Sequence, residues 1–541
     1  MIVKNTTLQS KTKQDRLNNE HIIPTHCITN VDVFDFLKSL SEYKVSKEVI
    51  LYSIGCELLG DSPNPHIKQF LSEYQYDCIE IENIPKNEFD LLGSTYQYLN
   101  SKKENLERGS FYTGYGTAID FVDDLNFDSD QTILDPSCGS GTFLFSSNAK
   151  SNQIFGVDND PIAVMIAKFN YFIKFPLGEY PNIFCNDFFV WHSNNEIKFD
   201  YIIGNPPYGA TLNLSNVHSQ YIKSGEIFSY FIEYGYSILK DDGVLRYLLP
   251  ESILNVKKHS DVRTYILENT NLTHIKRYKS RFSGVMSELY MVELKLNSIG
   301  ECVLFTKDST VEIPKSIFKS LKNSIFTYLT DIDVSIIEKV ESVKGHTLLN
   351  SVFALGVVTG NNKEKLLDNP IEGSEPIYSG KEVGKYKLSP AKKHIVFDRS
   401  NLQQVASDDI YRACEKLIYK TINKNIKVAI DTTGSLTTNS ANIIIPKIDE
   451  IDIYTIMGIL NTNLYSYLNI KLFGGVNKVS KENLQALPLP KITNSENLKI
   501  KEMVMSIIQN GDDSPLEKYI NEGIFNLSNE EVEYINLGIK N

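Results

Sequence analysis

The tetrapeptide Asn205-Pro206-Pro207-Tyr208 carries the groups needed to hold a planar amino group. The Asn205 side-chain oxygen and the Pro206 carbonyl are both hydrogen-bond acceptors, so together they can bind the two hydrogens of one NH2 group. Proline fixes its φ angle, which aims the Pro206 carbonyl in advance. The ring of Tyr208 can stack on a flat ring. By itself, the tetrapeptide is also compatible with an ordinary turn after a buried strand.

The elements that would position this tetrapeptide are predicted strands. The apolar run at residues 201–204 predicts a buried strand directly before it. Upstream, residues 133–135 predict another strand, which runs into a glycine-rich turn at residues 136–141 and then a helix. The spacing of this turn differs from the GxGxxG of nicotinamide and flavin folds. It places the carboxylate of Asp135 at a strand end and glycines where the backbone must approach a ligand.

Two further predicted strands, at residues 154–157 and 182–185, also end in acidic residues. A carboxylate at the tip of the second strand, about 20 residues beyond a glycine turn, usually receives ribose hydroxyls in a doubly wound sheet. Asp158 occupies that position. Asp187 can accept from an adenine amino group, and Phe188 can pack on the adenine ring. Ligands in open α/β sheets bind at the carboxyl ends of strands, so this order predicts one ligand site.

These motifs resemble those of S-adenosylmethionine-dependent methyltransferases, specifically the gamma-class adenine-N6 DNA methyltransferases of restriction–modification systems. Members usually carry a Tyr-Thr-Pro element before the glycine turn, where this chain has Tyr112-Thr113-Gly114. The glycine replaces the usual proline, so a more mobile loop is expected. The resemblance implies an α/β fold with a Rossmann-like methyltransferase sheet, S-adenosylmethionine as cofactor, and no metal.

The resemblance also assigns roles to individual residues. Thr113, Asp135, Gly139 and Gly141 are assigned to the methionine side of the cofactor, Asp158 to ribose, and Asp187 with Phe188 to adenine. The expected cofactor-binding set is Tyr112, Thr113, Asp135, Pro136, Cys138, Gly139, Gly141, Asp158, Asn159, Asp187, Phe188 and Asn205. The expected catalytic residues are Asn205, Pro206, Pro207 and Tyr208, which would hold an adenine flipped out of duplex DNA. We expect Cys138 to be a small packing residue and not a nucleophile.

The C-terminal part resembles the α+β target-recognition domain of the same enzymes. Segments at 355–363, 378–386, 459–465 and 474–490 carry this resemblance in the expected order. The loop at 474–484 mixes glycines with hydrogen-bonding side chains, which suits contacts to base edges or phosphates, although a plain surface hairpin is the alternative. The residues expected to bind DNA are Lys276, Arg277, Lys279, Arg281, Phe282, Asn361, Lys381, Gly475, Asn477, Lys478, Ser480 and Lys481; of these, Phe282 marks the segment expected to supply a second base-stacking aromatic.

The chain has 541 residues, enough for two or three domains. We expect an N-terminal helical region at 1–100, the catalytic domain at 101–310, a linker at 311–345 and the recognition domain at 346–541. The net charge of −12 argues against a broadly basic surface, but local patches can still bind DNA. The run at 276–281 is one such patch. The spacing of Lys416, Lys420, Lys424 and Lys427 predicts a second, on one face of a helix.

Other classes are disfavoured by composition. The seven cysteines include no CxxC pair, so the sequence suggests neither a zinc site nor a disulfide framework, and we infer a reducing cytoplasm. No apolar run approaches the ~18 residues of a membrane span, and the N-terminus lacks a secretion signal, so no membrane partner is expected. We find no convincing PD-(D/E)xK spacing in residues 1–100, so we do not predict DNA cleavage by this chain.

Two rival functions stay open from the sequence. Asn-Pro-Pro-Tyr also occurs in methyltransferases that act on protein glutamine, and related tetrapeptides occur in those that act on RNA. The chain could also be a non-catalytic DNA-binding specificity subunit. Double-stranded DNA is the expected partner, and a cognate restriction endonuclease or a separate specificity subunit is an open addition. The sequence does not reveal the DNA recognition sequence.

Overall fold

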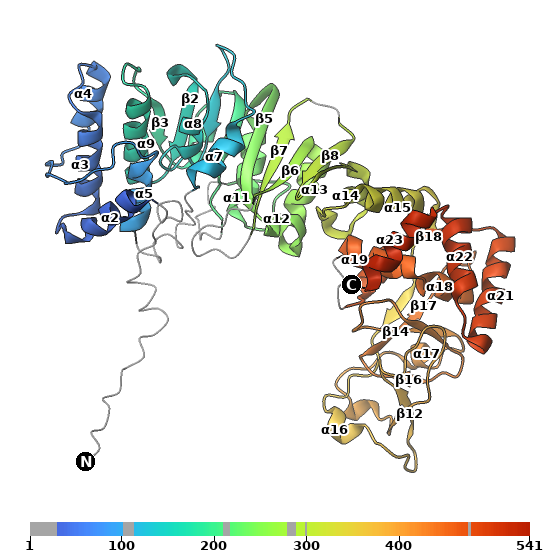
Figure 1. Cartoon of the computed structure of the whole chain (residues 1–541). Helices are drawn as coiled ribbons and strands as arrows, with labels where there is room; N and C mark the ends of the chain where they lie inside the picture. Colours follow the sequence, from blue (N-terminus) through green and yellow to red (C-terminus); the bar gives the residue numbers. More distant parts are fainter. Residues whose placement is uncertain are drawn as a thin grey trace, which may run out of the picture. The chain divides into compact units, whose positions relative to one another are not determined.

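The computed structural model describes residues 30–100, 113–208, 217–278, 288–297, 300–473 and 478–540. Six of the predicted site residues lie outside these ranges: Tyr112, Lys279, Arg281, Phe282, Gly475 and Asn477. The chain folds as two compact units (Figure 1). The first comprises the residues up to 316 together with 323–326, and the second comprises 317–322 and the residues from 327 onward.

A nine-stranded sheet forms the centre of the first unit, in the order β3-β2-β1-β4-β5-β7-β6-β8-β9 (Figure 1). Its strands are β1 (Ile133–Asp135), β2 (Ile154–Asp158), β3 (Asn182–Cys185), β4 (Phe199–Gly204), β5 (Leu239–Pro250), β6 (Leu272–Tyr278), β7 (Leu289–Lys295), β8 (Cys302–Thr306) and β9 (Thr310–Pro314). The strands from β1 to β5 pair in parallel, whereas β7 is antiparallel to β5 and β6. The predicted Rossmann-like sheet is confirmed.

The strand order reverses at β1, which lies between β2 and β4. At such a switch point the connections leave on opposite sides and open a crevice at the carboxyl ends of the strands. The helices that connect and cover the strands are α7 (Tyr115–Val122), α8 (Thr142–Ser146), α9 (Pro161–Lys174), α10 (Phe188–Ser193), α11 (Ile227–Ser237), α12 (Ser252–Asn255) and α13 (Ser260–Asn269). The polar residues that were predicted at the strand ends therefore lie together at one edge of the sheet.

The N-terminal helices belong to the first unit. They are α2 (Val31–Ser39), α3 (Lys47–Leu59), α4 (Pro65–Ser72) and α5 (Leu91–Leu99). Helices α3 and α5 both contact α9, and Phe70 of α4 packs edge-to-face on Phe169 of α9 with ring centroids 4.8 Å apart. A Cβ atom at Gly55 would approach the Phe169 ring to 2.6 Å, so glycine permits α3 to lie close against α9.

The second unit combines small sheets with helices, as predicted for an α+β domain. One sheet has the order β11 (Val352–Ala354), β17 (Ala441–Ile445), β14 (Lys416–Lys420), β15 (Val428–Asp431); another has the order β13 (Lys393–Ile395), β12 (Glu375–Tyr378), β16 (Leu436–Thr437); and β10 (Lys344–His346) pairs with β18 (Leu489–Pro490). The helices include α15 (Asp331–Ser342), α16 (Asn362–Lys365), α17 (Asp408–Tyr411), α18 (Ile453–Leu460), α19 (Asn463–Phe473), α20 (Lys481–Ala486), α21 (Asn494–Asn510), α22 (Ser514–Lys518) and α23 (Asn529–Lys540). The segment expected as a linker, 311–345, is itself folded: it contributes to β9, and it forms α14 (Lys315–Ser320) and α15.

The predicted basic helical face at residues 416–427 is wrong. Lys416–Lys420 form strand β14, which pairs with β15 and β17 on its two sides. The aliphatic and aromatic residues between the two lysines favour a strand, and pairing on both sides fixes it. Lys416 is fully buried in an ion pair with Asp431, with an N–O distance of 2.6 Å. It therefore cannot contribute to a solvent-facing patch.

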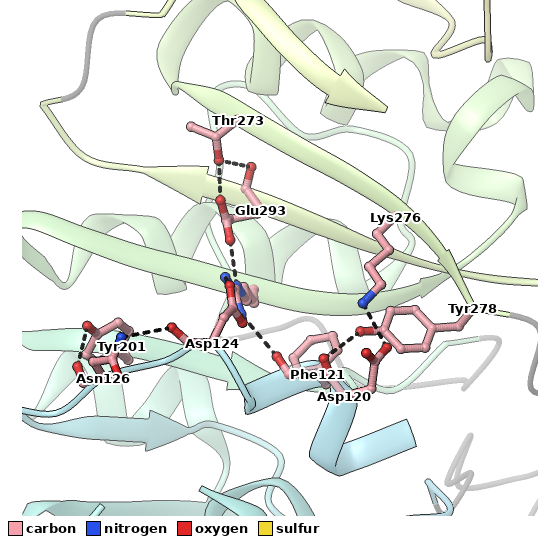
Figure 2. Close-up of polar contacts among 10 residues, drawn as sticks. Asp120, Phe121, Asp124, Asn126, Tyr201, Thr273, Lys276, Tyr278 and Glu293 are labelled. Atoms are coloured by element: carbon pink, nitrogen blue, oxygen red, sulfur yellow. Dashed lines mark hydrogen bonds and ion pairs between the residues drawn. The ribbon is translucent and has the colours of Figure 1, made fainter. Parts of the chain in front are cut away.

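Arg246 of β5 holds helix α7 against the sheet. Its guanidinium donates to both carboxylate oxygens of Asp124, at 2.5 and 2.7 Å, and its Nε donates to Glu293 of β7 at 2.5 Å. Nearby, Lys276 pairs with Asp120 at 2.8 Å, and the Tyr278 hydroxyl donates to the Asp120 carbonyl at 3.3 Å (Figure 2). The end of α7 is thus tied directly to β5 and β6, and only through Arg246 to β7, whereas its start follows Thr113.

We predict that Arg246→Met lowers the free energy of unfolding of the first unit by about 3 kcal/mol, because it leaves the largely buried Glu293 carboxylate without its cation. Denaturant unfolding followed by the fluorescence of Trp191, the single tryptophan, measures this unit. The control is Lys86→Met, which breaks an exposed pair with Glu57 and should cost less than about 1 kcal/mol. Equal losses in the two variants would contradict the role given to Arg246.

Candidate cofactor and target site

A cavity of about 440 Å³ lies at the carboxyl ends of β1, β2, β3 and β4. Its lining includes most of the predicted cofactor-binding residues: Thr113, Asp135, Pro136, Cys138, Gly139, Asp158, Asn159, Asp187, Phe188 and Asn205. Pro207 also lines it. Residues from four strand ends and from the start of α7 therefore meet around one space at the switch point.

Asp135 lies at the centre of this arrangement. Its side chain is 1% exposed, and its Oδ1 accepts the Ser137 backbone N–H at 3.0 Å. A Cβ atom at Gly204, whose φ is +150°, would lie 2.5 Å from the same oxygen. Glycine before Asn205 therefore allows the end of β4 to touch the Asp135 carboxylate. Burial raises the pKa of Asp135 to about 8, and the negative charge of Asp158 adds to the rise.

Asp158 ties the glycine turn to the end of β2. Its Oδ2 accepts the Gly139 backbone N–H at 2.8 Å, and its Oδ1 accepts the Asp160 backbone N–H at 2.9 Å. Burial raises the pKa of Asp158 to about 6, although these two hydrogen bonds act to lower it. Two neighbouring carboxyl groups with raised pKa values favour a ligand that brings positive charge or hydrogen-bond donors.

The two glycines of the turn have different roles. Gly139 has φ +54°, and a Cβ atom there would meet no protein atom within 4 Å, so its open side faces free space. Gly141 has φ +84°, and a Cβ atom there would overlap the ring of Phe145 at 2.2 Å. Gly141 does not line the cavity; it permits the packing of α8. Cys138 is buried, its Sγ lies against Gly156, and burial holds the pKa of its thiol far above the usual range, which agrees with a packing role.

The predicted catalytic tetrapeptide follows β4. Asn205 and Pro207 line the cavity, whereas Pro206 is buried. Tyr208 is 9% exposed. Burial raises the pKa of Tyr208, so the phenol is neutral. A base could stack on this ring only after the ring is uncovered.

Asp187 and Phe188, which were expected to bind adenine, line the cavity at the start of α10. The Asp187 Oδ1 caps α10 by accepting the backbone N–H groups of Phe189 and Val190, at 2.9 and 3.1 Å. Phe188 stacks on Phe231 of α11, with ring centroids 5.1 Å apart and an interplanar angle of 27°. Phe231 therefore supports the ring of Phe188 on the cavity wall.

Several lining residues were missed by sequence reasoning. They include Tyr96, Asn100, Phe143, Asp160, Pro161, Asn186, Phe189 and Phe231. The pair Asp160-Pro161 could have been found, since an N-cap aspartate followed by proline marks the start of α9 directly after β2. Tyr96 and Asn100 lie four residues apart at the end of α5, but no local pattern distinguishes them from core positions.

Asp90 joins the N-terminal helices to the glycine turn. It caps α5 in the left-handed conformation, with φ +50°. Its Oδ2 accepts from the hydroxyls of Ser140 and Thr142, at 2.5 and 2.7 Å, and its Oδ1 accepts from Asn170 Nδ2 at 2.8 Å. A single carboxylate thus links α5, the glycine turn and α9.

The described residues predicted to bind DNA fall into two groups. Lys276 pairs with Asp120, and Arg277 pairs with Asp308 at 2.7 Å and with Glu288 at 3.8 Å. In the second unit, Lys381, Lys478 and Lys481 are exposed, whereas the side chains of Asn361 and Ser480 cap helices α16 and α20. The pairs on β6 lower the net positive charge that this strand presents.

Each unit contains a segment that matches a family model. Residues 152–282 match the model of the Eco57I restriction-modification methylase family, and residues 375–489 match that of the TaqI-like C-terminal specificity domain. The chain thus contains one segment similar to restriction–modification methylases and, after it, one similar to TaqI-like C-terminal specificity domains, in the order that the motifs predicted.

Two relatives that are named as type II methyltransferases are similar to much of the chain. The type II methyltransferase M.VspI of Vibrio sp. (strain 343) is 28% identical over 349 residues, which cover 61% of this chain and 84% of the relative. The type II methyltransferase M.CvrRI of Paramecium bursaria Chlorella virus XZ-6E is 26% identical over 293 residues, 53% of this chain and 70% of the relative. The solved structure of the type IIL restriction–modification enzyme MmeI in complex with DNA aligns with a TM-score of 0.49 and 12% identity, covering 94% of this chain and 89% of that chain.

Within the described part of the chain, no helix has both the length and the apolar character needed to cross a bilayer.

We predict that the first unit loses stability as the pH rises from about 4 to 8, on the order of a few kcal/mol. The pKa of Asp135 is about 8 in the folded chain against 3.8 for the free side chain, so folding favours the protonated form and this contribution is lost as the carboxyl ionises. Unfolding of the wild type and of Asp135→Asn, followed by Trp191 fluorescence at pH 5, 6.5 and 8, tests this.

In Asp135→Asn, the slope attributed to Asp135 should vanish. The matched control is Asp123→Asn, which removes an exposed carboxylate on the same unit and should leave the slope unchanged. If wild type and Asp135→Asn show parallel pH dependence, the buried carboxyl does not titrate as described.

Proposed function

We propose that this protein transfers a methyl group from S-adenosylmethionine to the exocyclic N6 of a flipped adenine in duplex DNA, as the modification enzyme of a restriction–modification or related defence system. One observation carries the proposal: Asn205 and Pro207 line the same cavity as Asp135, Gly139 and Asp158. An acceptor pair for an amino group therefore adjoins a site with the chemistry of a nucleoside cofactor pocket. The similarity to named type II methyltransferases supports the same reaction class.

The residues of the cavity fit S-adenosylmethionine. Gly139 leaves open space where a side chain would otherwise project, which suits close approach of a ligand to the backbone. Asp135 and Asp158 carry raised pKa values, and each would be better satisfied by an ammonium, a sulfonium or hydroxyl donors. Phe188, supported by Phe231, offers a flat apolar face for a purine. When bound, S-adenosylmethionine supplies an electrophilic methyl group on a positively charged sulfur.

The acceptor chemistry belongs to the tetrapeptide. The lone pair of an adenine amino group is delocalised into the ring, which makes the nitrogen a poor nucleophile. Asn205 Oδ1 and the Pro206 carbonyl can accept the two amino hydrogens, which localises the lone pair and stabilises the positive charge that develops on nitrogen.

Access to the amino group requires base flipping. The N6 atom of a stacked adenine cannot reach a pocket at the strand ends, so the base must leave the helix, at a cost of a few kcal/mol. Tyr208 is 9% exposed, so we propose that entry of the base uncovers its ring and that stacking on it offsets part of this cost. The exposed Lys381, Lys478 and Lys481 of the second unit are proposed phosphate or base contacts.

The proposal is tested by incubating the purified chain with labelled S-adenosylmethionine in three separate reactions, which contain duplex DNA, structured RNA or host proteins as the methyl acceptor. We expect label in duplex DNA, as N6-methyladenine at one sequence, located by sequencing with modified-base detection. Label in protein glutamine or in RNA would favour the first rival function. Binding of DNA without binding of S-adenosylmethionine would favour a non-catalytic specificity subunit.

We predict that Asn205→Ala lowers the rate of methyl transfer by on the order of a hundredfold or more, because it removes one of two acceptors for the amino hydrogens. Single-turnover methylation measures the chemical step, and calorimetry measures cofactor affinity. Cofactor affinity should change little. The control is Asn126→Ala, which alters an exposed asparagine of the same unit. A rate within a few-fold of wild type for Asn205→Ala would refute the acceptor role.

We predict that Tyr208→Ala weakens binding of DNA that carries an extrahelical adenine by roughly tenfold, since one base stack is lost. Tyr208→Phe keeps the ring and loses only the hydroxyl group, so it should remain within a few-fold of wild type in both binding and rate. Fluorescence of 2-aminopurine at the target position reports flipping directly. If Tyr208→Phe is as inactive as Tyr208→Ala, the hydroxyl and not the ring face carries the role.

A further inference from the structure

The glycine turn is held by two carboxylates that come from different parts of the first unit. Asp158, at the end of β2, accepts the Gly139 backbone N–H at 2.8 Å. Asp90, at the start of α5, accepts from the hydroxyls of Ser140 and Thr142, at 2.5 and 2.7 Å. The sheet therefore holds the first part of the turn, and the N-terminal helices hold the part that follows.

Asn170 of α9 reinforces the second hold. Its Nδ2 donates to Asp90 Oδ1 at 2.8 Å and to the Ser140 carbonyl at 3.0 Å. Ser140 is thus fixed through its side chain and through its backbone, and it lines the cavity. Gly139, whose Cβ side is open space, directly precedes this fixed residue. A ligand that approaches Gly139 would therefore meet a backbone whose shape depends on Asp90.

Two features of α5 are unfavourable for a helix start and are explained by this carboxylate. Asp90 has a left-handed backbone, with φ +50° and ψ 44°, although an N-cap residue usually has an extended one. Gly93 is a poor helix former inside α5. A Cβ atom at Gly93 would lie 2.5 Å from the carboxylate oxygens of Asp90, so glycine leaves the room that the carboxylate occupies. Residues that break local rules in this way are expected where function requires them.

We propose that Asp90 is a positioning residue for the cofactor, and that Gly93 makes room for it. Through Ser140 and Thr142, Asp90 would hold the glycine turn in the shape that receives the methionine moiety of S-adenosylmethionine, the part that the sequence motifs assign to this turn. The proposal rests on the proposed function, since it assigns a further role within the same site. It makes the N-terminal helices a determinant of cofactor affinity.

Two ligands that share an adenosine part test the proposal by binding alone. S-adenosylmethionine carries the amino-acid moiety, whereas 5′-methylthioadenosine lacks it. Asp90→Ser keeps a side-chain oxygen that can cap α5, but this side chain is too short to hold the turn. Calorimetry should show about tenfold weaker binding of S-adenosylmethionine to this variant, as expected when about one hydrogen bond is lost, and less than about twofold change for 5′-methylthioadenosine.

Gly93→Ala is an independent variant that keeps every polar group and favours the helix. Its Cβ atom would displace the Asp90 carboxylate, so it should weaken S-adenosylmethionine about as much as Asp90→Ser does. Asp90→Asn is the conservative variant. It keeps the cap, and the hydroxyls of Ser140 and Thr142 can turn to accept from its NH2 group, so it should retain most of the affinity.

The matched control is Lys168→Met, on the same helix as Asn170. It breaks an ion pair with Glu73, in which the N–O distance is 3.0 Å, so it should lower the free energy of unfolding and change neither affinity. Denaturant unfolding followed by Trp191 fluorescence measures the stability of each variant. This control separates a loss of stability from a loss of ligand binding.

The outcomes separate the positioning role from the proposed function. If wild type does not bind S-adenosylmethionine, the proposed function fails. If wild type binds both ligands, but Asp90→Ser and Gly93→Ala change the two affinities by the same factor or leave both unchanged, the positioning role fails alone. In that case Asp90 serves only to join α5 to α9 and the turn.

Discussion

The contact between the Asp135 carboxylate and the backbone of Gly204 is the constraint on which the site depends. It joins the end of β1 to the end of β4, the two strands that flank the reversal of strand order. One side of this contact continues into the glycine turn, and the other continues into Asn205. Any side chain at Gly204 would push these two segments apart. The distance between the proposed cofactor part and the proposed acceptor part of the cavity is therefore set by sheet pairing, without depending on the surrounding loops.

The same contact has an electrostatic effect. Asp135 is buried beside a second carboxyl, Asp158, so the cavity without a ligand favours holding protons. A positively charged ligand would favour release of those protons, so binding and ionisation are linked. Such a ligand also binds the folded unit alone and would stabilise it. Binding of a positively charged ligand would thus offset the free-energy cost of burying the two carboxyl groups.

Sequence reasoning found the parts of the site that lie at strand ends. Asp135, Asp158, Asp187 and Asn205 each follow a short apolar run, and a parallel sheet brings such positions together whatever the details of packing. It missed Tyr96 and Asn100, because their approach depends on how α5 packs against α9, which no local pattern encodes. It also placed Lys416 on a helix, because the spacing of the lysines carries no information about the strands that pair with β14 on both sides. The role of Gly141 was assigned by motif, yet its neighbour is Phe145 and not the cavity.

The bonds around Asp90 have a consequence for dividing the chain. Ser140, Thr142 and Asn170 all donate to a carboxylate contributed by the segment before α5. A shortened chain that begins at Thr113 would lack Asp90, so these donors would hydrogen-bond to water. It would also expose the apolar surface of α9 that the N-terminal helices cover. The predicted boundary near residue 100 therefore cuts through a packed interface, and trimming the chain there should destabilise the first unit instead of leaving a minimal folded domain.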